Sequence, residues 1–191
     1  MTLSTEQLIA LARNYWRPDQ DYLLRQEKSP EDRRRDARWA EELKRIDRWH
    51  AFLRDVRQAL PNFTIGDGTA TPDVCFRCVA YPFRGRPPPP YSWIVVGCVS
   101  ILAPLYIVYS VRYGHVGNRT RLNPRVDFEP FPPEMEPVAD VIAQKIEETF
   151  GVSKLPRDIA DTPVPLFVKW VVPPETTLFH ALFTNEPDNV P

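Results

Sequence analysis

An uncharged stretch of 19 residues, Trp93–Val111, constrains the fold of this 191-residue chain more than any other feature. Its length is sufficient for a membrane-spanning helix. Eight of the 19 residues are Ile or Val, whose branched side chains favour strands. Pro104 divides the stretch into Trp93–Ile101 and Leu105–Tyr113, and in the second segment apolar side chains recur at every second position. We therefore predict two buried strands, and the alternative is a protein anchored to a membrane through residues 93–111.

The composition is typical of a globular protein, with 43% hydrophobic and 26% charged residues. We predict a single domain over residues 1–191, with a helical part at 1–60 and a part with sheet and helix at 61–191. The three cysteines are too few for a disulfide scaffold, and the first residues lack the features of a secretion signal. These observations predict a cytoplasmic protein with reduced thiols.

The first third has the signals of two helices. Ser4 and Gln7 have the spacing of a capping box, and Ser29 precedes Pro30, which suits the first position of a helix. Apolar residues then recur at steps of three and four from Trp39 to Leu60. The second helix is therefore predicted to run without interruption from Ser29 to Leu60.

The rest of the chain has the signals of several strands and one long helix. Besides the central pair, strands are predicted at residues 73–81, 126–128 and 164–172, a long helix ending at Gly151, and a short helix or strand at 175–183. The proline run at 87–90 predicts an extended linker. This order predicts an α+β fold: a mainly antiparallel sheet of about four to six strands, with two N-terminal helices and one long helix from the C-terminal half packed on it. The other face of such a sheet can stay open to a partner.

Charge is distributed unevenly, although the formal net charge is only −1. Residues 1–60 carry 13 basic and 11 acidic side chains and residues 61–133 carry 7 and 4, whereas residues 134–191 carry 4 and 10. The balance argues against a general nucleic-acid binder. The acidic last third predicts a contact with a basic partner surface. The candidate partner-binding residues are Glu134, Glu136, Asp140, Glu147, Glu148, Asp158 and Asp161.

Motifs for catalysis and for metal binding are few. Cys75 and Cys78 form a lone CxxC in a predicted strand, where residues three apart point to opposite faces. A structural zinc site needs a second pair of ligands, so we expect buried structural thiols and no metal or cofactor. His180 lies among apolar residues, and an enzyme with His180 or His115 as the base of a site assembled from scattered residues is the alternative. We expect no catalytic residues.

Three stretches together suggest a family. They are the segment Ser100–Tyr106 within the apolar double strand, the helix end Glu147–Gly151, and the late segment Thr177–Phe183. This combination, over roughly residues 50–185, resembles small bacterial immunity proteins found beside contact-delivered toxins, particularly those of swarming-inhibition toxin systems. The resemblance implies a cytoplasmic protein that binds and neutralises one cognate protein toxin and catalyses no reaction. It marks no functional residues.

Overall fold

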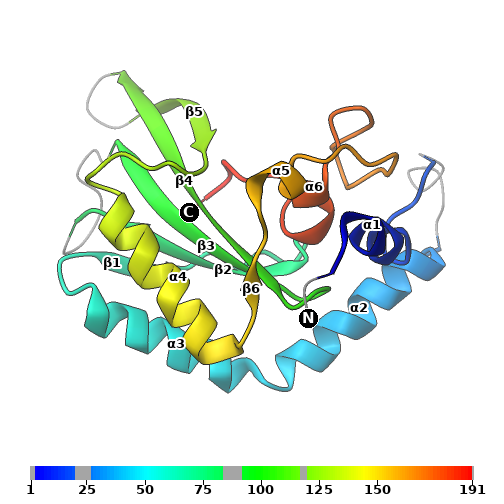
Figure 1. Cartoon of the computed structure of the whole chain (residues 1–191), viewed down its shortest axis with the longest axis horizontal. Coiled ribbons are helices and arrows are strands. Elements are labelled where there is room, and N and C mark those ends of the chain that lie inside the picture. The colour runs from blue at the N-terminus through cyan, green and yellow to red at the C-terminus, as the bar shows by residue number, and fades with distance from the viewer. Residues whose placement is uncertain (1–2, 20–26, 84–91, 117–119, 191) are drawn as a thin grey trace.

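The computed structural model describes residues 3–19, 27–83, 92–116 and 120–190, and it shows an α+β fold built on one sheet (Figure 1). Five strands follow one another in space in the order of the chain, each antiparallel to the next. They are β1 (Thr64–Asp67), β2 (Cys75–Tyr81), β3 (Trp93–Ser100), β4 (Leu105–Val116) and β5 (Thr120–Asp127). The short β6 (Ser153–Lys154) pairs with the start of β4 in parallel. This architecture confirms the predicted α+β fold class. The linker predicted at 87–90 lies outside the described residues.

The apolar stretch Trp93–Val111 forms two strands of this sheet, as its residues predict. β3 and β4 pair in antiparallel register, with Val96 opposite Tyr109, and the residues between the strands include Pro104. β3 is buried almost throughout, and β4 is buried from Leu105 to Val111. In the part of the chain that the structure describes, no helix has the length and apolar character needed to cross a membrane.

Two helices cover one face of the sheet: α3 (Ile46–Ala59) and α4 (Glu136–Phe150) (Figure 1). A Cβ atom built on Gly97 of β3 would lie 2.5 Å from Cγ2 of Ile142 and 3.1 Å from Cδ1 of Ile146. The glycine therefore lets α4 lie directly on the middle of the sheet. The same helix ends at Gly151, as predicted, and the positive φ of 64° there suits a residue without a side chain.

The other face of the sheet is also covered, so the expectation of an open face is wrong. The short helix α6 (Leu178–Leu182) and the segment that follows it, residues 183–190, lie against this face. The hydroxyl of Tyr109 donates to the carbonyl of Pro187 at 3.1 Å, and the Arg77 side chain donates to the carbonyl of Asn189 at 2.8 Å. Apolar side chains on both faces of β2, β3 and β4 are consequently buried.

The predicted helix from Ser29 to Leu60 is interrupted and forms two helices, α2 (Pro30–Leu43) and α3. The break lies at Lys44 and Arg45, and it turns α2 away from the line of α3 (Figure 1). Its effect is to bring two tryptophans to one ring: Trp39 from α2 and Trp49 from α3 lie 5.2 and 5.1 Å from the ring of Phe76, between centroids. The apolar residues keep their spacing of three and four through the break because both helices turn them toward the sheet.

The predicted strand at 164–172 is wrong, since this segment forms only isolated bridges. Pro163 and Pro165 lack the N–H groups that a regular ladder requires. The segment 175–183 contains α6, which satisfies one of the two predicted forms. Short helices complete the fold: α1 (Thr5–Arg13), whose predicted capping box at Ser4 is confirmed, and α5 (Arg157–Ala160). After α1, Trp16 donates from its indole N–H to the carbonyl of Ala181 at 2.7 Å, which ties the N-terminal segment to α6.

Candidate partner-binding surfaces

The seven predicted acidic residues are all exposed, but they do not form one surface. Five lie on or just before α4, while Asp158 and Asp161 lie on or after α5, beyond β6. Within the described chain, the side chains of Glu134, Glu136 and Asp140 have no ion pair or hydrogen bond. We call these three residues the acidic patch. Glu136 and Asp140 are four residues apart on α4 and so are neighbours on its outer side.

The remaining members of the predicted set have partners, with one exception. Glu147 accepts a hydrogen bond from the hydroxyl of Tyr106 at 2.6 Å. Burial is the main cause of the raised pKa of Tyr106, and this hydrogen bond is the second cause. Glu148 pairs with Lys145 at 2.7 Å and Asp161 pairs with Arg157 at 2.5 Å. Asp158 has no ion pair in the described structure, but it lies on a different element from the acidic patch. The role of all seven residues in binding a partner stays a prediction, and the three at the start of α4 are those near one another in sequence that have no ion pair in the described structure.

The acidic patch stands on a rigid support. The opposite side of α4 buries Val138, Ile142 and Ile146 against the sheet, and Met135 just before the helix is fully buried. The carboxylate of Glu134 attracts the Arg112 guanidinium electrostatically. The pKa of Arg112 is raised mainly by its hydrogen bond to Asp127 and to a smaller extent by this attraction. The backbone that carries the three carboxylates is thus anchored, and none of the three forms an ion pair in the described structure.

His180, the candidate base, takes part in capping α6. Its Nδ1 accepts a hydrogen bond from the backbone N–H of Thr177 at 3.1 Å and lies 3.0 Å from the hydroxyl of the same residue. Burial lowers the pKa of His180, and Asp161 partly opposes this effect. His115, the other candidate, belongs to β4, where its backbone lies opposite Arg121. Both hydrogen-bonding contacts of the His180 ring are thus with Thr177, the residue that precedes α6.

The cysteines of the CxxC motif point to opposite faces of β2, as predicted from their spacing. In the register, Cys78 lies opposite Gly97 and so on the α4 side, whereas Cys75 shares the other face with Arg77. All three cysteines are buried and unbridged. Burial is the main cause of the raised pKa of the Cys75 and Cys78 thiols. The residues with described placement contain no group of three His, Cys, Asp or Glu side chains suited to a metal ion.

Sequence reasoning missed the most exposed large apolar side chain among the described residues, that of Trp170, which is 72% exposed. It lies in the tight connection between Val168 and Val171, whose backbones exchange two hydrogen bonds of 3.0 Å. Lys169, also in this connection, has a positive φ of 54°. The strand predicted at 164–172 left no place for this turn. The signal that was available is the set of prolines on both sides, at positions 163, 165, 173 and 174.

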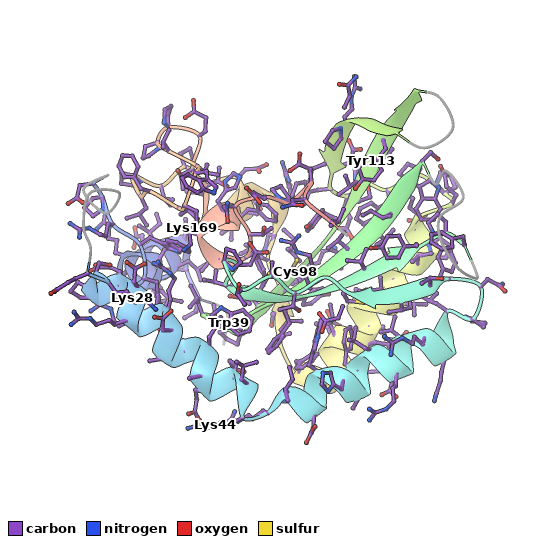
Figure 2. All side chains as sticks on the ribbon, turned by 180° about the vertical axis from the view of Figure 1, so that it is seen from behind. Lys28, Trp39, Lys44, Cys98, Tyr113 and Lys169 are labelled. Atoms are coloured by element: carbon purple, nitrogen blue, oxygen red, sulfur yellow. The ribbon has the colours of Figure 1, made fainter. Side chains whose placement is uncertain are left out.

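Beside α2 lies a polar cavity of about 160 Å³, and Lys169 lines it from one side (Figure 2). The α2 residues that line it include Asp32, Arg35 and Asp36. Arg35 is paired with Asp32, and Lys28, two residues before the helix, is paired with Asp36 at 2.6 Å. The charged side chains that line the polar cavity therefore largely neutralise one another.

A second hollow continues from the polar cavity along α2. It measures about 360 Å³, and we call it the apolar recess; its walls are Asp36, Trp39, Ala40, Leu43, Thr69 and Thr71. The polar cavity shares Asp36, Trp39 and Thr71 with it, so the two hollows adjoin. Leu43 at its rim is 52% exposed.

Comparison with known proteins assigns no family to this arrangement: no protein-family model, no curated protein and no solved structure matches the chain.

Proposed function

We propose that this chain is an immunity protein, which binds a cognate bacterial toxin in the cytoplasm and neutralises it by occlusion, without a reaction of its own. The observation that carries the proposal is the acidic patch of Glu134, Glu136 and Asp140, three exposed carboxylates without an ion-pair partner in the described structure. The family resemblance of the sequence supports the same function. The partner is a protein, and neither nucleic acid nor membrane is required.

The chemistry of the patch indicates the kind of toxin surface that it fits. Exposed carboxylates on and just before the first turns of α4 attract a basic surface and repel an acidic one. A toxin that acts on a phosphate-containing substrate has basic side chains at its active site. Covering that site with carboxylates would exclude the substrate by both charge and volume.

The fixed position of the patch supports tight binding. Because α4 is packed on the sheet along Gly97, little backbone ordering is required when the toxin binds. Complementary charges also accelerate the encounter of two proteins at low ionic strength. A protein that protects its own cell benefits from both effects.

The experiment co-expresses this chain with the product of the reading frame adjacent to its own gene, as the candidate toxin, and measures growth. Calorimetry then measures binding of the purified pair. The test variant is Glu136→Lys/Asp140→Lys. The matched control is Asp47→Lys/Asp55→Lys on α3, which changes the net charge equally at exposed positions. We expect the test variant to lower the affinity by about tenfold or more at low salt and less at high salt.

Each result bears on a separate part of the proposal. If the wild-type chain neither binds the toxin nor protects growth, the proposed function is wrong. If the two double variants lose the same affinity, net charge rather than the acidic patch is responsible, and the patch is not the binding site.

A further inference from the structure

A small hollow of about 50 Å³ lies where three segments of the chain meet. These segments are the residues after α1, the start of α2, and the residues just before Trp170. Three basic side chains line the hollow, those of Arg17, Arg35 and Lys169, against one acidic side chain, that of Asp32. We call it the basic hollow.

The charge of its lining distinguishes the basic hollow from the polar cavity beside it. The two share Asp32, Arg35 and Lys169, but the polar cavity is lined by three basic and three acidic side chains in all. In the basic hollow, three positive charges face one negative charge. Asp19 pairs with Arg17 at 2.8 Å without lining the hollow, and one positive charge stays in excess even when Asp19 is counted.

The two arginines of the basic hollow are held in place and largely withdrawn from water. The side chain of Arg35 is 11% exposed and that of Arg17 is 16% exposed. The Arg35 guanidinium donates to the carbonyl of Tyr15 and lies 4.0 Å from the centre of the Trp16 ring. The N–H of Phe167 donates to the carbonyl of Arg17 at 2.8 Å, which joins the segments that carry Arg17 and Lys169. Like charges withdrawn from water are unfavourable unless an anion balances them.

The third basic residue, Lys169, has an unusual backbone conformation. Its φ of 54° is uncommon for a residue other than glycine, and such conformations are concentrated at binding and catalytic sites. The side chain is half-buried. Burial, followed by repulsion from Arg35, lowers the pKa of Lys169. An anion in the basic hollow would relieve this repulsion.

We propose that the basic hollow is a binding site for a phosphate group, either free inorganic phosphate or the phosphate of a small ester. A phosphate group carries close to two negative charges at neutral pH, which suits a lining of three positive charges and one negative charge. Guanidinium groups match the geometry of phosphate oxygens. This inference is independent of the proposed function, because it concerns neither the acidic patch nor the toxin.

The size of the basic hollow limits the ligand. A space of about 10–15 Å³ is sufficient for one water molecule. About 50 Å³ therefore accommodates a group of a few heavy atoms, such as phosphate, whereas a whole nucleotide would extend beyond it. The rest of a small ester has room in the adjoining polar cavity of about 160 Å³.

The test is calorimetric titration of the full chain at about pH 7.5 and constant ionic strength, with inorganic phosphate, glycerol phosphate and acetate as separate probes. Lys169→Asn removes one charge and keeps a residue type that tolerates a positive φ. Arg17→Gln removes another charge on a different segment. The matched control is Lys28→Asn, which removes a charge from the polar cavity but not from the basic hollow (Figure 2).

We expect the wild type and Lys28→Asn to bind phosphate with similar affinity, and Lys169→Asn and Arg17→Gln each to weaken binding by about tenfold or more. Tighter binding of glycerol phosphate than of inorganic phosphate would identify an ester as the ligand, and the reverse order the free ion. Circular dichroism and urea unfolding verify that each variant is folded, and either variant that folds is sufficient for the test.

Three results would overturn the proposal. One is a wild-type chain that shows no saturable binding of either phosphate compound up to about 10 mM, since a built site is expected to bind well below that concentration. Another is acetate binding as tightly as phosphate, which would show a site without preference for a phosphate group. The third is an equal loss of affinity in Lys28→Asn and in the two test variants, because general attraction by positive charge would then explain the binding.

Discussion

Arg77 and Asp73 form an ion pair beneath the C-terminal segment, with side chains that are only 2% and 4% exposed. The guanidinium also donates to the hydroxyl of Thr184 at 2.6 Å and to the carbonyl of Asn189 at 2.8 Å. Burial raises the pKa of Asp73, and the attraction of Arg77 opposes this effect. The pair thus connects the start of β2 with the segment that covers the sheet.

Replacing Arg77 by Met is expected to lower the free energy of unfolding by about 3–5 kcal/mol, because it leaves the Asp73 carboxylate buried without a counter-charge. Arg112→Met is the matched control, since Arg112 and Asp127 form a pair at 2.6 Å whose side chains are 48% and 32% exposed. Its expected cost is much smaller, because an exposed ion pair contributes little to stability. Urea unfolding measures both values. Equal losses in the two variants would contradict the structural role of the buried pair.

Gly97→Ala is expected to destabilise the protein by about 1–3 kcal/mol, because the new methyl group would overlap Ile142 and force α4 away from the sheet. Gly66→Ala in β1 is the control, since a Cβ atom there meets its nearest neighbour at 3.4 Å, an ordinary contact. Thermal and urea unfolding measure the difference between the two variants. If Gly97→Ala is as stable as Gly66→Ala, α4 does not pack on β3 as described.

The central strands could be predicted from the sequence because their signals are local. Branched side chains, alternation and Pro104 all lie within Trp93–Val111, and the capping residue Gly151 is equally local. The break at Lys44 has no such signal. The contacts that accompany it, of Trp39 and Trp49 with Phe76 of β2, form only in the folded chain.

The candidate site was predictable only in part. The seven carboxylates could be named from charge alone, but the contact of Glu147 with Tyr106 joins residues 41 positions apart and required the fold. The covering of the second sheet face depends on equally distant contacts, such as that of Tyr109 with Pro187. The exposure of Trp170 could not be predicted because its apolar neighbours favour a strand over residues 164–172.

The three thiols are expected to be unreactive toward a disulfide reagent such as dithionitrobenzoate in the native protein. Cys75, Cys78 and Cys98 are each 0% exposed, and burial raises the pKa of the first two, which disfavours the reactive thiolate. Absorbance at the wavelength of the released anion measures the reaction. All three thiols should react once the protein is unfolded in urea. Rapid reaction of any thiol in the folded state would contradict the described burial.

His180 is expected to make the free energy of unfolding decrease as the pH falls below about 6.5. Burial lowers the pKa of this residue from its ordinary value of 6.5, and its unprotonated Nδ1 accepts the N–H of Thr177. Below pH 6.5 the unfolded chain therefore binds a proton that the folded chain still excludes, so the free energy of unfolding decreases as the pH falls. His180→Asn keeps a neutral acceptor at this position. Urea unfolding from about pH 7.5 to pH 5 should show the wild type losing stability relative to this variant only in the acidic range, because the histidine is neutral in both states above it. Parallel pH profiles for the two proteins would show that the His180 ring titrates equally in the folded and unfolded chains.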